Sequence, residues 1–255
     1  MNAPGPLLTV LIPLFNEAPN VAPLLAELRA TLASPVFAPS AGGAAAIEVL
    51  LVDDGSTDDT AGQLAAAAAA WDVVRVERFP VNRGQAAALW WGFRHARGAW
   101  IATLDGDGQN PPDQLTALWS RRDSADLICG RRVRRHDTLL RRVMSGVANP
   151  VRRALLRDGV RDTGCSLKLM RREVVDSFFP IRTLYSFLPA FAVAGGWQVL
   201  EVPVEHRPRR AGESKYGLRA MAVYPLLDLL ALGWLLRRTL RPGHRRPKDA
   251  PLPPS

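Results

Sequence analysis

The feature of this sequence that most limits its fold is an alternation of short apolar runs with segments of helical pattern. The runs are rich in β-branched residues, and they lie at residues 7–15, 47–52, 73–79, 99–104, 125–130 and 197–206. Several of them lack an apolar–polar alternation, which is typical of strands that are covered on both faces. Because helical segments separate most of these runs, we expect right-handed crossovers and a mostly parallel central sheet.

Helical patterns occupy the intervals between these runs. We predict helices near residues 20–33, 58–70, 84–96, 112–121 and 183–195. The unbroken alanines of residues 65–70 are compatible only with a helix among the regular structures. Residues 34–46 are predicted to form a surface loop. The chain of 255 residues suits one large α/β domain, alone or with an appendage.

The composition indicates which kinds of partner the protein binds and in which kind of cellular compartment it occurs. The formal net charge is +9 and most of the cationic residues are arginine, which favours nucleic acid, phosphorylated ligands or an anionic membrane as partners. The two cysteines form no CxxC motif, so we expect a reducing compartment. The scattered histidines and cysteines match no zinc pattern, and the first 15 residues do not resemble a signal peptide.

Polar residues follow three of the predicted strands at the point where each strand ends. They are Asn16 and Glu17 after the first strand, the acids of residues 53–58 after the second, and Asp105, Asp107 and Gln109 after the fourth. Ligands of open α/β sheets bind beyond the carboxyl ends of the strands. We therefore expect a binding site at this edge of the sheet.

Asp105 and Asp107 end an apolar strand and are separated only by Gly106. Two carboxylates held this close repel each other unless a cation lies between them. Oxygen ligands of this kind suit Mg²⁺ or Mn²⁺, which are usually shared with substrate phosphates, and Gln109 offers an additional neutral oxygen. The alternative is a turn that uses Asp and Gly only for their backbone preferences.

The segment VDDGSTDDT at residues 52–60 permits two interpretations. Ser56 or Thr57 can cap the following helix, and acids are favoured in the first turn of a helix. Asp53 and Asp54 are not needed for capping, and an acid at this place can accept hydrogen bonds from a nucleoside base or ribose. Both interpretations are compatible with the sequence.

Six motifs occur in order along the chain: VLIPLFNE (10–17), VLLVDDGSTDDT (49–60), NRGQAAAL (82–89), TLDGDGQNPP (103–112), DTGCSLKLMRREV (162–174) and RRAGESKYG (209–217). Together they resemble the family-2 glycosyltransferases of the polyprenyl-phosphate branch, which includes dolichol-phosphate mannosyltransferase and undecaprenyl-phosphate formamido-arabinose transferase. The resemblance implies a GT-A fold and a GDP- or UDP-linked sugar donor. It also implies an inverting, metal-dependent transfer to an undecaprenyl or dolichyl phosphate, giving a lipid-linked sugar for the cell envelope.

The resemblance also assigns roles to individual positions. Nucleotide-sugar contacts fall on Pro13, Phe15, Glu17, Val52, Asp54, Asp105 and Gly106, and metal contacts on Asp105, Asp107 and Gln109, with Mg²⁺ or Mn²⁺ as the cofactor. Catalytic roles at the phosphates fall on Asp107, Arg132, Arg209 and Lys215, and acceptor-phosphate contacts on Arg131 and Ser166. The chain departs from the family pattern at Phe15, where Tyr is familiar, at Gly106, where Ala is frequent, and at Cys165 and Lys168.

The chemistry of such a transfer depends mainly on charge. A departing nucleoside diphosphate carries negative charge that cations must stabilise. The acceptor phosphate already carries about −1.5 to −2 charges and needs positioning more than a strong base. Asp162 is open to two interpretations, an orienting hydrogen-bond acceptor or a structural residue after a turn. Lys215 lies between two glycines, and we expect it on a hinged lid.

Residues 218–236 are nearly all apolar and would form a helix of about 28 Å. Asp228 near the middle and Pro225 argue against a transmembrane span, so we expect a segment that lies on the membrane or packs against a partner. The arginines that follow favour an anionic, cytoplasmic membrane face. The predicted organisation is a GT-A domain over 1–217, an apolar membrane-associated helix over 218–240 and a disordered basic, proline-rich tail over 241–255.

These features predict a peripheral or monotopic protein at the cytoplasmic face of the inner (plasma) membrane. Its expected partners are the nucleotide-sugar donor, the polyprenyl-phosphate acceptor and the anionic membrane surface, with a separate membrane protein or a second copy of the chain as further candidates. Two other functions stay open: a related glycosyltransferase with a saccharide or other non-lipid acceptor, and a basic nucleic-acid-binding protein. The second is disfavoured, because acids at the strand ends would repel a phosphate backbone.

Overall fold

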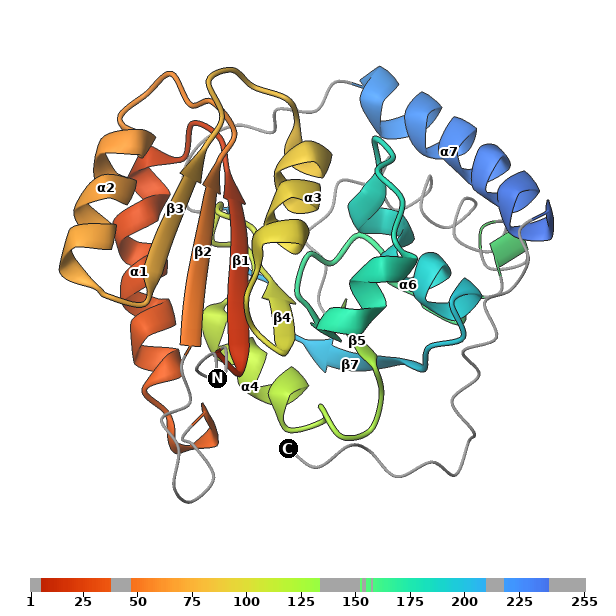
Figure 1. Ribbon diagram of the computed structural model, residues 1–255, viewed down its shortest axis with the longest axis horizontal. Coiled ribbons are helices and arrows are strands. Elements are labelled where there is room, and N and C mark those ends of the chain that lie inside the picture. The colour runs from red at the N-terminus through yellow and green to blue at the C-terminus, as the bar shows by residue number, and fades with distance from the viewer. Residues whose placement is uncertain are drawn as a thin grey trace, which may run out of the picture.

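The computed structural model describes residues 6–37, 47–133, 152, 155, 156, 158–209 and 218–238. Within this part of the chain, one seven-stranded sheet has the order β3-β2-β1-β4-β6-β5-β7. Its strands are β1 (Leu8–Leu14), β2 (Ile47–Asp53), β3 (Val74–Arg78), β4 (Trp100–Thr103), β5 (Leu127–Arg132), β6 (Lys168–Arg171) and β7 (Val199–Val204). Helices flank the sheet (Figure 1), so the predicted α/β class is confirmed.

The sheet is mostly parallel, as predicted. Strand β1 pairs in parallel with β2 and β4, β2 with β3, and β5 with β7. Strand β6 is the exception in the described sheet, because it runs antiparallel to both β4 and β5. The sequence pattern does not predict β6, since its four residues are too few to give a recognisable apolar run. Pairing with two strands that are distant in sequence holds it in place.

The predicted helices are all present. They are α1 (Ala18–Leu32), α2 (Thr60–Ala70), α3 (Gln85–His95), α4 (Leu115–Trp119), α6 (Leu184–Ala194) and α7 (Leu218–Arg238). Short 3₁₀ helices occur at Pro35–Phe37, Pro112–Gln114 and Arg172–Ser177. The helix predicted over 112–121 is thus a 3₁₀ turn followed by the short α4. The predicted loop 34–46 contains the first 3₁₀ helix, and its remaining residues 38–46 lie outside the described part.

Two hydrophobic cores lie on opposite faces of the sheet (Figure 1). On one face, α1, α2 and α4 pack their buried side chains, such as Leu28 and Leu64, against Val10 and Ile12. On the other face, α3, α6 and α7 cover Leu11 and its neighbours. Because β1 is buried on both faces, its sequence is continuously apolar rather than alternating.

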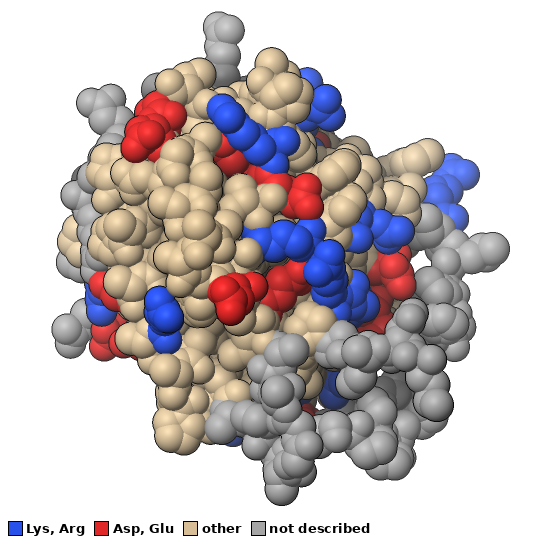
Figure 2. All heavy atoms as spheres, turned by 60° about the vertical axis from the view of Figure 1, so that its left-hand side comes forward, with Lys and Arg blue, Asp and Glu red and all other residues tan. Residues whose placement is uncertain are grey.

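Charged side chains of both signs are mixed on the molecular face shown in Figure 2. Among the described residues visible there, Lys and Arg alternate with Asp and Glu and do not form one continuous basic patch. A protein that binds nucleic acid through its backbone phosphates would be expected to carry such a patch. This face of the molecule therefore gives no support to the nucleic-acid alternative.

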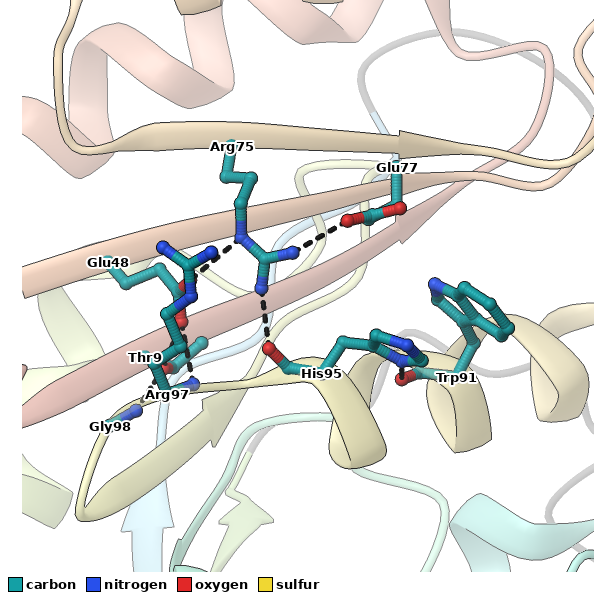
Figure 3. A network of polar contacts seen from close by, with 8 residues as sticks. All are labelled: Thr9, Glu48, Arg75, Glu77, Trp91, His95, Arg97 and Gly98. Atoms are coloured by element: carbon teal, nitrogen blue, oxygen red, sulfur yellow. Dashed lines mark hydrogen bonds and ion pairs between the residues drawn. The ribbon is translucent and has the colours of Figure 1, made fainter. Parts of the chain in front are cut away.

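A buried polar network joins the amino-terminal ends of the strands (Figure 3). The Glu48 carboxylate accepts hydrogen bonds from Thr9 Oγ1 (2.6 Å), the Arg97 amide (2.9 Å) and Arg75 Nε (2.9 Å). Arg75 also donates to Glu77 (2.6 Å) and to the His95 carbonyl at the end of α3 (2.5 Å). The network ties β1, β2, β3 and α3 together at the edge of the sheet that is opposite the predicted site.

Helix α7 is attached to the rest of the fold by the acid in its middle. Asp228 Oδ2 accepts hydrogen bonds from the Thr183 amide (3.1 Å) and from Thr183 Oγ1 (2.6 Å), and Thr183 is the N-cap residue of α6. Leu229 and Leu232 are buried in the core shared with α3 and α6. Asp228 is thus a structural contact between two helices, which explains a charged residue in an otherwise apolar segment.

The opposite side of α7 remains apolar and exposed. Among the side chains that the structure describes on this helix, the most exposed apolar ones are Leu226, Leu227, Leu230 and Trp234. Within the described residues, no helix combines the length and the apolar character that crossing a bilayer requires. The predicted tail at 241–255 lies outside the described part.

Candidate active site

The loops that follow β1 and β2 are bound to each other at the carboxyl edge of the sheet. The Asn16 amide donates to Ser56 Oγ (2.9 Å), and the Thr57 amide donates to Asn16 Oδ1 (2.8 Å). Asn16 itself has a positive φ of 51°, which an asparagine tolerates. Ser56 and Thr57 therefore join two loops and do not cap α2, whose N-cap residue Asp59 makes no side-chain cap hydrogen bond.

Asp105 lies partly buried, two residues after the end of β4. Its Oδ1 accepts a hydrogen bond from Gln85 Nε2 (2.9 Å) at the start of α3, and Ser166 also bonds to the carboxylate. Burial raises the pKa of Asp105, although the Ser166 hydrogen bond and the positive charges of Lys168 and Arg132 act in the opposite direction. The carboxylate is therefore held by two groups, one on α3 and one in the segment before β6.

Asp107 is buried and lies beside a cation. Its Oδ1 accepts the Gln109 amide (3.0 Å), and its Oδ2 accepts a hydrogen bond from Arg209 Nη2 (2.9 Å). Burial, together with the negative charge of Asp105, raises the pKa of Asp107 to about 6. Glu17 after β1 lies close to Arg209, with an Oε1–Nη1 distance of 3.8 Å. Arg209 thus lies between two predicted site acids.

Arg132 and Arg131 point to opposite faces of β5, because successive side chains of a strand alternate. Arg132 forms a two-bond contact with Asp162, from Nε to Oδ2 (2.8 Å) and from Nη2 to Oδ1 (2.8 Å). Its positive charge also acts against the rise in the pKa of Asp105. Arg131 lies on the alternate side of β5, so it does not share the contact with Asp162.

The segment that carries Ser166 is fixed from several sides. Ser166 Oγ accepts a hydrogen bond from Asn110 Nδ2 (2.6 Å), and its carbonyl accepts one from Thr103 Oγ1 (2.5 Å). The buried Lys168 ammonium donates to the carbonyls of Thr163 and Cys165 within the same segment. A small cavity behind Asp105 is lined by Gln85, Leu89, Thr103, Leu104, Asp105, Ser166, Lys168, Tyr185 and Leu188.

Asp54 has a role that its sequence motif does not reveal. Its carboxylate accepts hydrogen bonds from the Arg83 amide (2.7 Å), the Gly84 amide (2.8 Å) and Asn82 Nδ2 (2.9 Å). Only 2% of Asp54 is exposed, and burial raises the pKa of its carboxyl. Asp54 therefore organises the loop 82–84 that leads into α3.

The other predicted site residues differ in how deeply they are buried. The side chain of Val52 is fully buried in the core under α3. Pro13 and Gly106 are buried where β1 meets the acid pair, and a Cβ on Gly106 would lie 3.1 Å from Leu14 Cδ2. Phe15 is half-buried in the same region. Lys215 and the predicted lid at 210–217 lie outside the described residues.

Three residues that contact predicted site residues are absent from the sequence prediction. Gln85, Asn110 and Glu201 contact Asp105, Ser166 and the segment around Asp162, respectively. Gln85 follows NRG in one of the recognised motifs and Asn110 follows DGDGQ, so both stood next to a usable signal. Glu201 lies within an apolar strand that comes much later in the chain, and no local pattern connects it to the site.

The donor set of the acid pair fits a hard divalent cation. Asp105 and Asp107 supply carboxylate oxygens, and Gln109 follows two residues later on the same loop. Among the described residues, no group of three or more His, Cys, Asp or Glu side chains is arranged to hold a metal ion. Two carboxylates are a sufficient protein contribution for Mg²⁺ or Mn²⁺ when substrate phosphates complete the coordination.

Comparison with protein families and curated proteins gives a consistent result. The family model described as Glycosyl transferase family 2 matches residues 9–179. The chain is 35% identical to dodecaprenyl-phosphate galacturonate synthase of Rhizobium johnstonii, over 93% of this chain and 69% of that protein. It is 33% identical to undecaprenyl-phosphate 4-deoxy-4-formamido-L-arabinose transferase of Klebsiella pneumoniae, over 87% of this chain and 67% of that protein.

Solved structures share the fold at lower identity. Glucosyl-3-phosphoglycerate synthase from Mycobacterium tuberculosis aligns with a TM-score of 0.65 and 21% identity, over 90% of this chain and 80% of that one. The mannosyltransferase PcManGT from Pyrobaculum calidifontis, solved with GDP-Man and Mn²⁺, aligns with a TM-score of 0.63 and 21% identity, over 93% and 66% of the two chains. At this identity, the likeness concerns the fold alone.

Proposed function

This chain belongs to glycosyl transferase family 2, and from that premise we propose that it moves a sugar from a nucleotide-sugar donor to a polyprenyl phosphate with inversion at the transferred carbon. The observation that carries the acceptor class is the match to two polyprenyl-phosphate sugar transferases over about nine-tenths of the chain. The acid pair at the carboxyl edge of a GT-A sheet supports a nucleotide diphosphate as the donor group. The product is a lipid-linked sugar.

The acid pair is the proposed binding place of the donor diphosphate and its cation. Asp105 and Asp107, with Gln109 beside them, would hold Mg²⁺ or Mn²⁺, as Mn²⁺ accompanies the donor in the solved mannosyltransferase. A bound divalent ion would neutralise negative charge on the departing nucleoside diphosphate. Gln85 and Ser166 hold the Asp105 carboxylate oriented through hydrogen bonds before the donor binds.

Cationic side chains complete the proposed site. Arg209 bonds to Asp107 in this structure, and we assign it to the donor or acceptor phosphates once a cation occupies the acid pair. Arg132, whose positive charge acts on Asp105, is assigned to the same task, and Lys215 is assigned to it by its motif alone. Two anions must approach each other in this reaction, and fixed positive charges lower the repulsion between them.

The acceptor phosphate needs orientation rather than activation, because it is already an anion near neutral pH. Ser166 adjoins Asp105 and is held by Asn110, which supports the assignment of its segment to the acceptor side. Arg131 is assigned to the acceptor phosphate by its motif alone. We retain Pro13, Phe15 and Glu17 as donor contacts because they line the same edge.

We further propose that the protein docks on the cytoplasmic face of the inner membrane through the exposed apolar side of α7. Leu226, Leu227, Leu230 and Trp234 would enter the interface, while Asp228 and Leu229 hold the helix on the catalytic domain. In this arrangement 218–240 is an appendage of the 1–217 domain, and the basic tail 241–255 adds attraction to anionic lipid.

The direct test is an assay for lipid-linked sugar. Purified protein would be supplied with Mn²⁺ or Mg²⁺, a panel of UDP- and GDP-sugars, and a short polyprenyl phosphate, and the lipid would be analysed by mass spectrometry. We expect a sugar–phosphate–prenyl product with one donor, and its loss when Asp105 and Asp107 are both changed to Asn. Transfer only to saccharides, or product formation that survives the double change, would contradict the proposal.

A further inference from the structure

We propose that Asp162 is a positioning residue that holds the Arg132 guanidinium in the orientation required at the phosphates. The inference rests on the proposed function, because it takes from there the assignment of Arg132 to a phosphate. It chooses between the two roles that the sequence left open for Asp162 and names the residue that Asp162 orients. The contacts of Asp162 with Arg132 and Glu201, and the space left by Gly164, support it.

The contact between Asp162 and Arg132 has a defined geometry. Both carboxylate oxygens are used, at 2.8 Å from Nε and 2.8 Å from Nη2, and Oδ2 also accepts the Arg132 amide at 3.1 Å. A carboxylate that bonds two guanidinium nitrogens fixes the plane of the group, and therefore the direction of its other N–H donors. Only 11% of the Arg132 side chain and 7% of the Asp162 side chain are exposed.

Asp162 is in turn anchored to the sheet. Glu201 Oε1, on β7, accepts hydrogen bonds from the backbone amides of Asp162 (2.9 Å) and Arg161 (2.8 Å). Strand β7 is the parallel neighbour of β5, which carries Arg132 at its end. Arg132 is therefore carried by β5, and Asp162 is bonded to the neighbouring β7. The pairing of these two strands sets the relative position of the two residues.

Gly164 leaves the space that this arrangement requires. A Cβ at position 164 would lie 3.0 Å from Arg132 Nη2, closer than a side chain normally approaches a neighbour. An alanine there would require the guanidinium to shift by a few tenths of an ångström, and its Cβ would also lie 3.7 Å from Asp162 Oδ1. Gly164 follows Asp162 by two residues in the DTG motif, which gives this part of the motif a physical reason.

A purely structural role for the contact is the competing explanation. A buried ion pair gains little net stability, because both charges lose their hydration. The structure also contains a comparable pair nearby that has no relation to the acids. Asp158 Oδ2 accepts a hydrogen bond from Arg152 Nη1, and its Oδ1 accepts the Val160 amide at 3.2 Å. Asp158 therefore serves as a matched control for the loss of one buried Asp–Arg pair.

The test is a double-mutant cycle with Arg132→Ala, Asp162→Asn and the two combined. The measured quantities are kcat, KM for the donor, and the Kd for UDP and GDP with Mn²⁺. We expect Arg132→Ala to lower kcat/KM about 100-fold, as for the loss of one oriented charge donor. Asp162→Asn should lower it about 10- to 100-fold, because misplacement of such a group is nearly as costly as its loss. The double variant should be no worse than Arg132→Ala alone.

Multiplied losses in the double variant would overturn the proposal, because Asp162 would then act independently of Arg132. An equal activity loss in Asp158→Asn would also overturn it, since the cause would be general loosening. If Asp162→Asn does not fold, Arg132→Lys tests the same geometry, because it keeps the charge but cannot form the two-nitrogen contact with Asp162, and full activity in that variant would refute the positioning role. If the wild-type protein binds UDP or GDP but glycosylates no polyprenyl phosphate, the proposed acceptor is refuted. The role of Asp162 is then tested by the Kd values for UDP and GDP in the same double-mutant cycle.

Discussion

At the scale of single residues, burial controls the chemistry of the acid pair. Asp105 and Asp107 lie close together in a region of low solvent access. Burial raises the pKa of each carboxyl above that of an exposed aspartate, so the protonated form is favoured. Arg209 offsets part of this cost at Asp107. A site with unfavourable negative charge of its own is prepared to accept a cation, because the ion removes the repulsion that burial has intensified.

The raised pKa of Asp107 gives a pH-dependent prediction. Its value is 3.8 in an ordinary aspartate and about 6 here, so between these values the folded protein binds more protons than the unfolded chain. The stability that protonated Asp107 contributes is fully present below pH 3.8 and is lost as the pH rises through about 6. Without divalent ions, Asp107→Asn should therefore unfold at a higher temperature than wild type above pH 6 and at a similar temperature at pH 4.

Thermal unfolding followed by circular dichroism at several pH values checks this prediction. The same variant should lose transferase activity, and Mn²⁺ should raise the unfolding temperature of the wild type but not of Asp107→Asn. The interpretation fails if the variant is the less stable protein at pH 8. It also fails if Mn²⁺ stabilises both proteins equally.

At the scale of elements, polar contacts at the two edges of the sheet have different tasks. The amino-terminal edge is fastened by Glu48, which bonds to β1, β3 and the turn before β4 (Figure 3). The carboxyl edge carries the acids, Arg209 and the loop before α3. Because the stabilising network lies at the amino-terminal edge, the carboxyl edge can hold acids that repel each other without loss of the contacts that join the strands.

Glu48→Ala should destabilise the protein by about 3 to 5 kcal/mol, because it leaves Arg75 and other buried donors without their carboxylate. Glu77→Ala is the matched control, since it removes a more exposed partner of the same arginine and should cost about 1 kcal/mol or less. Denaturant unfolding measures both values. The two variants should keep the same Kd for UDP with Mn²⁺, because the network lies at the far edge, and equal destabilisation would contradict the special role of Glu48.

Helix α7 combines a bonded face with an apolar exposed face. Replacing Leu227 and Leu230 together by Asp should weaken binding to lipid vesicles at least tenfold, because each buried leucine contributes roughly 1.5 to 3 kcal/mol. Val36→Asp is the control, since Val36 is also exposed (46%) but lies in the first 3₁₀ helix. Co-sedimentation with vesicles measures the effect. Unchanged binding of the leucine variant would exclude this face of α7 as the membrane contact.

At the scale of the whole molecule, the net charge of +9 is an average over unlike regions. The face in Figure 2 mixes both signs, whereas the sequence after α7 is strongly basic. A charge excess of this kind acts on association with an anionic surface rather than on the fold. It is consistent with a protein that approaches a membrane by charge and is retained there by apolar contact.

Binding to vesicles should therefore depend on both lipid charge and salt. We expect the full-length protein to bind vesicles with 30% anionic lipid more tightly than neutral ones, and to lose about tenfold in affinity between low salt and about 0.5 M salt. A residual, salt-resistant affinity should remain from α7. Binding that is independent of lipid charge would contradict the electrostatic part of this prediction.

The sequence by itself determined the elements and the edge at which the acids gather, because apolar periodicity and turn chemistry are local properties. Six strands, the helices and the position of Asp105 and Asp107 after a strand follow from such signals. The choice of family also follows from sequence, since six ordered motifs are a property of the chain.

Only the tertiary structure decided which partners these residues have. The insertion of β6 between β4 and β5, the contact of Asp162 with Arg132, the loop role of Asp54 and the bond from Asp228 to the start of α6 all join segments that are distant in the chain. The position of Arg132 at the end of β5 decided that its side chain bonds to Asp162. Pairing and register depend on the summed packing of the whole sheet, and no short stretch of sequence contains that information.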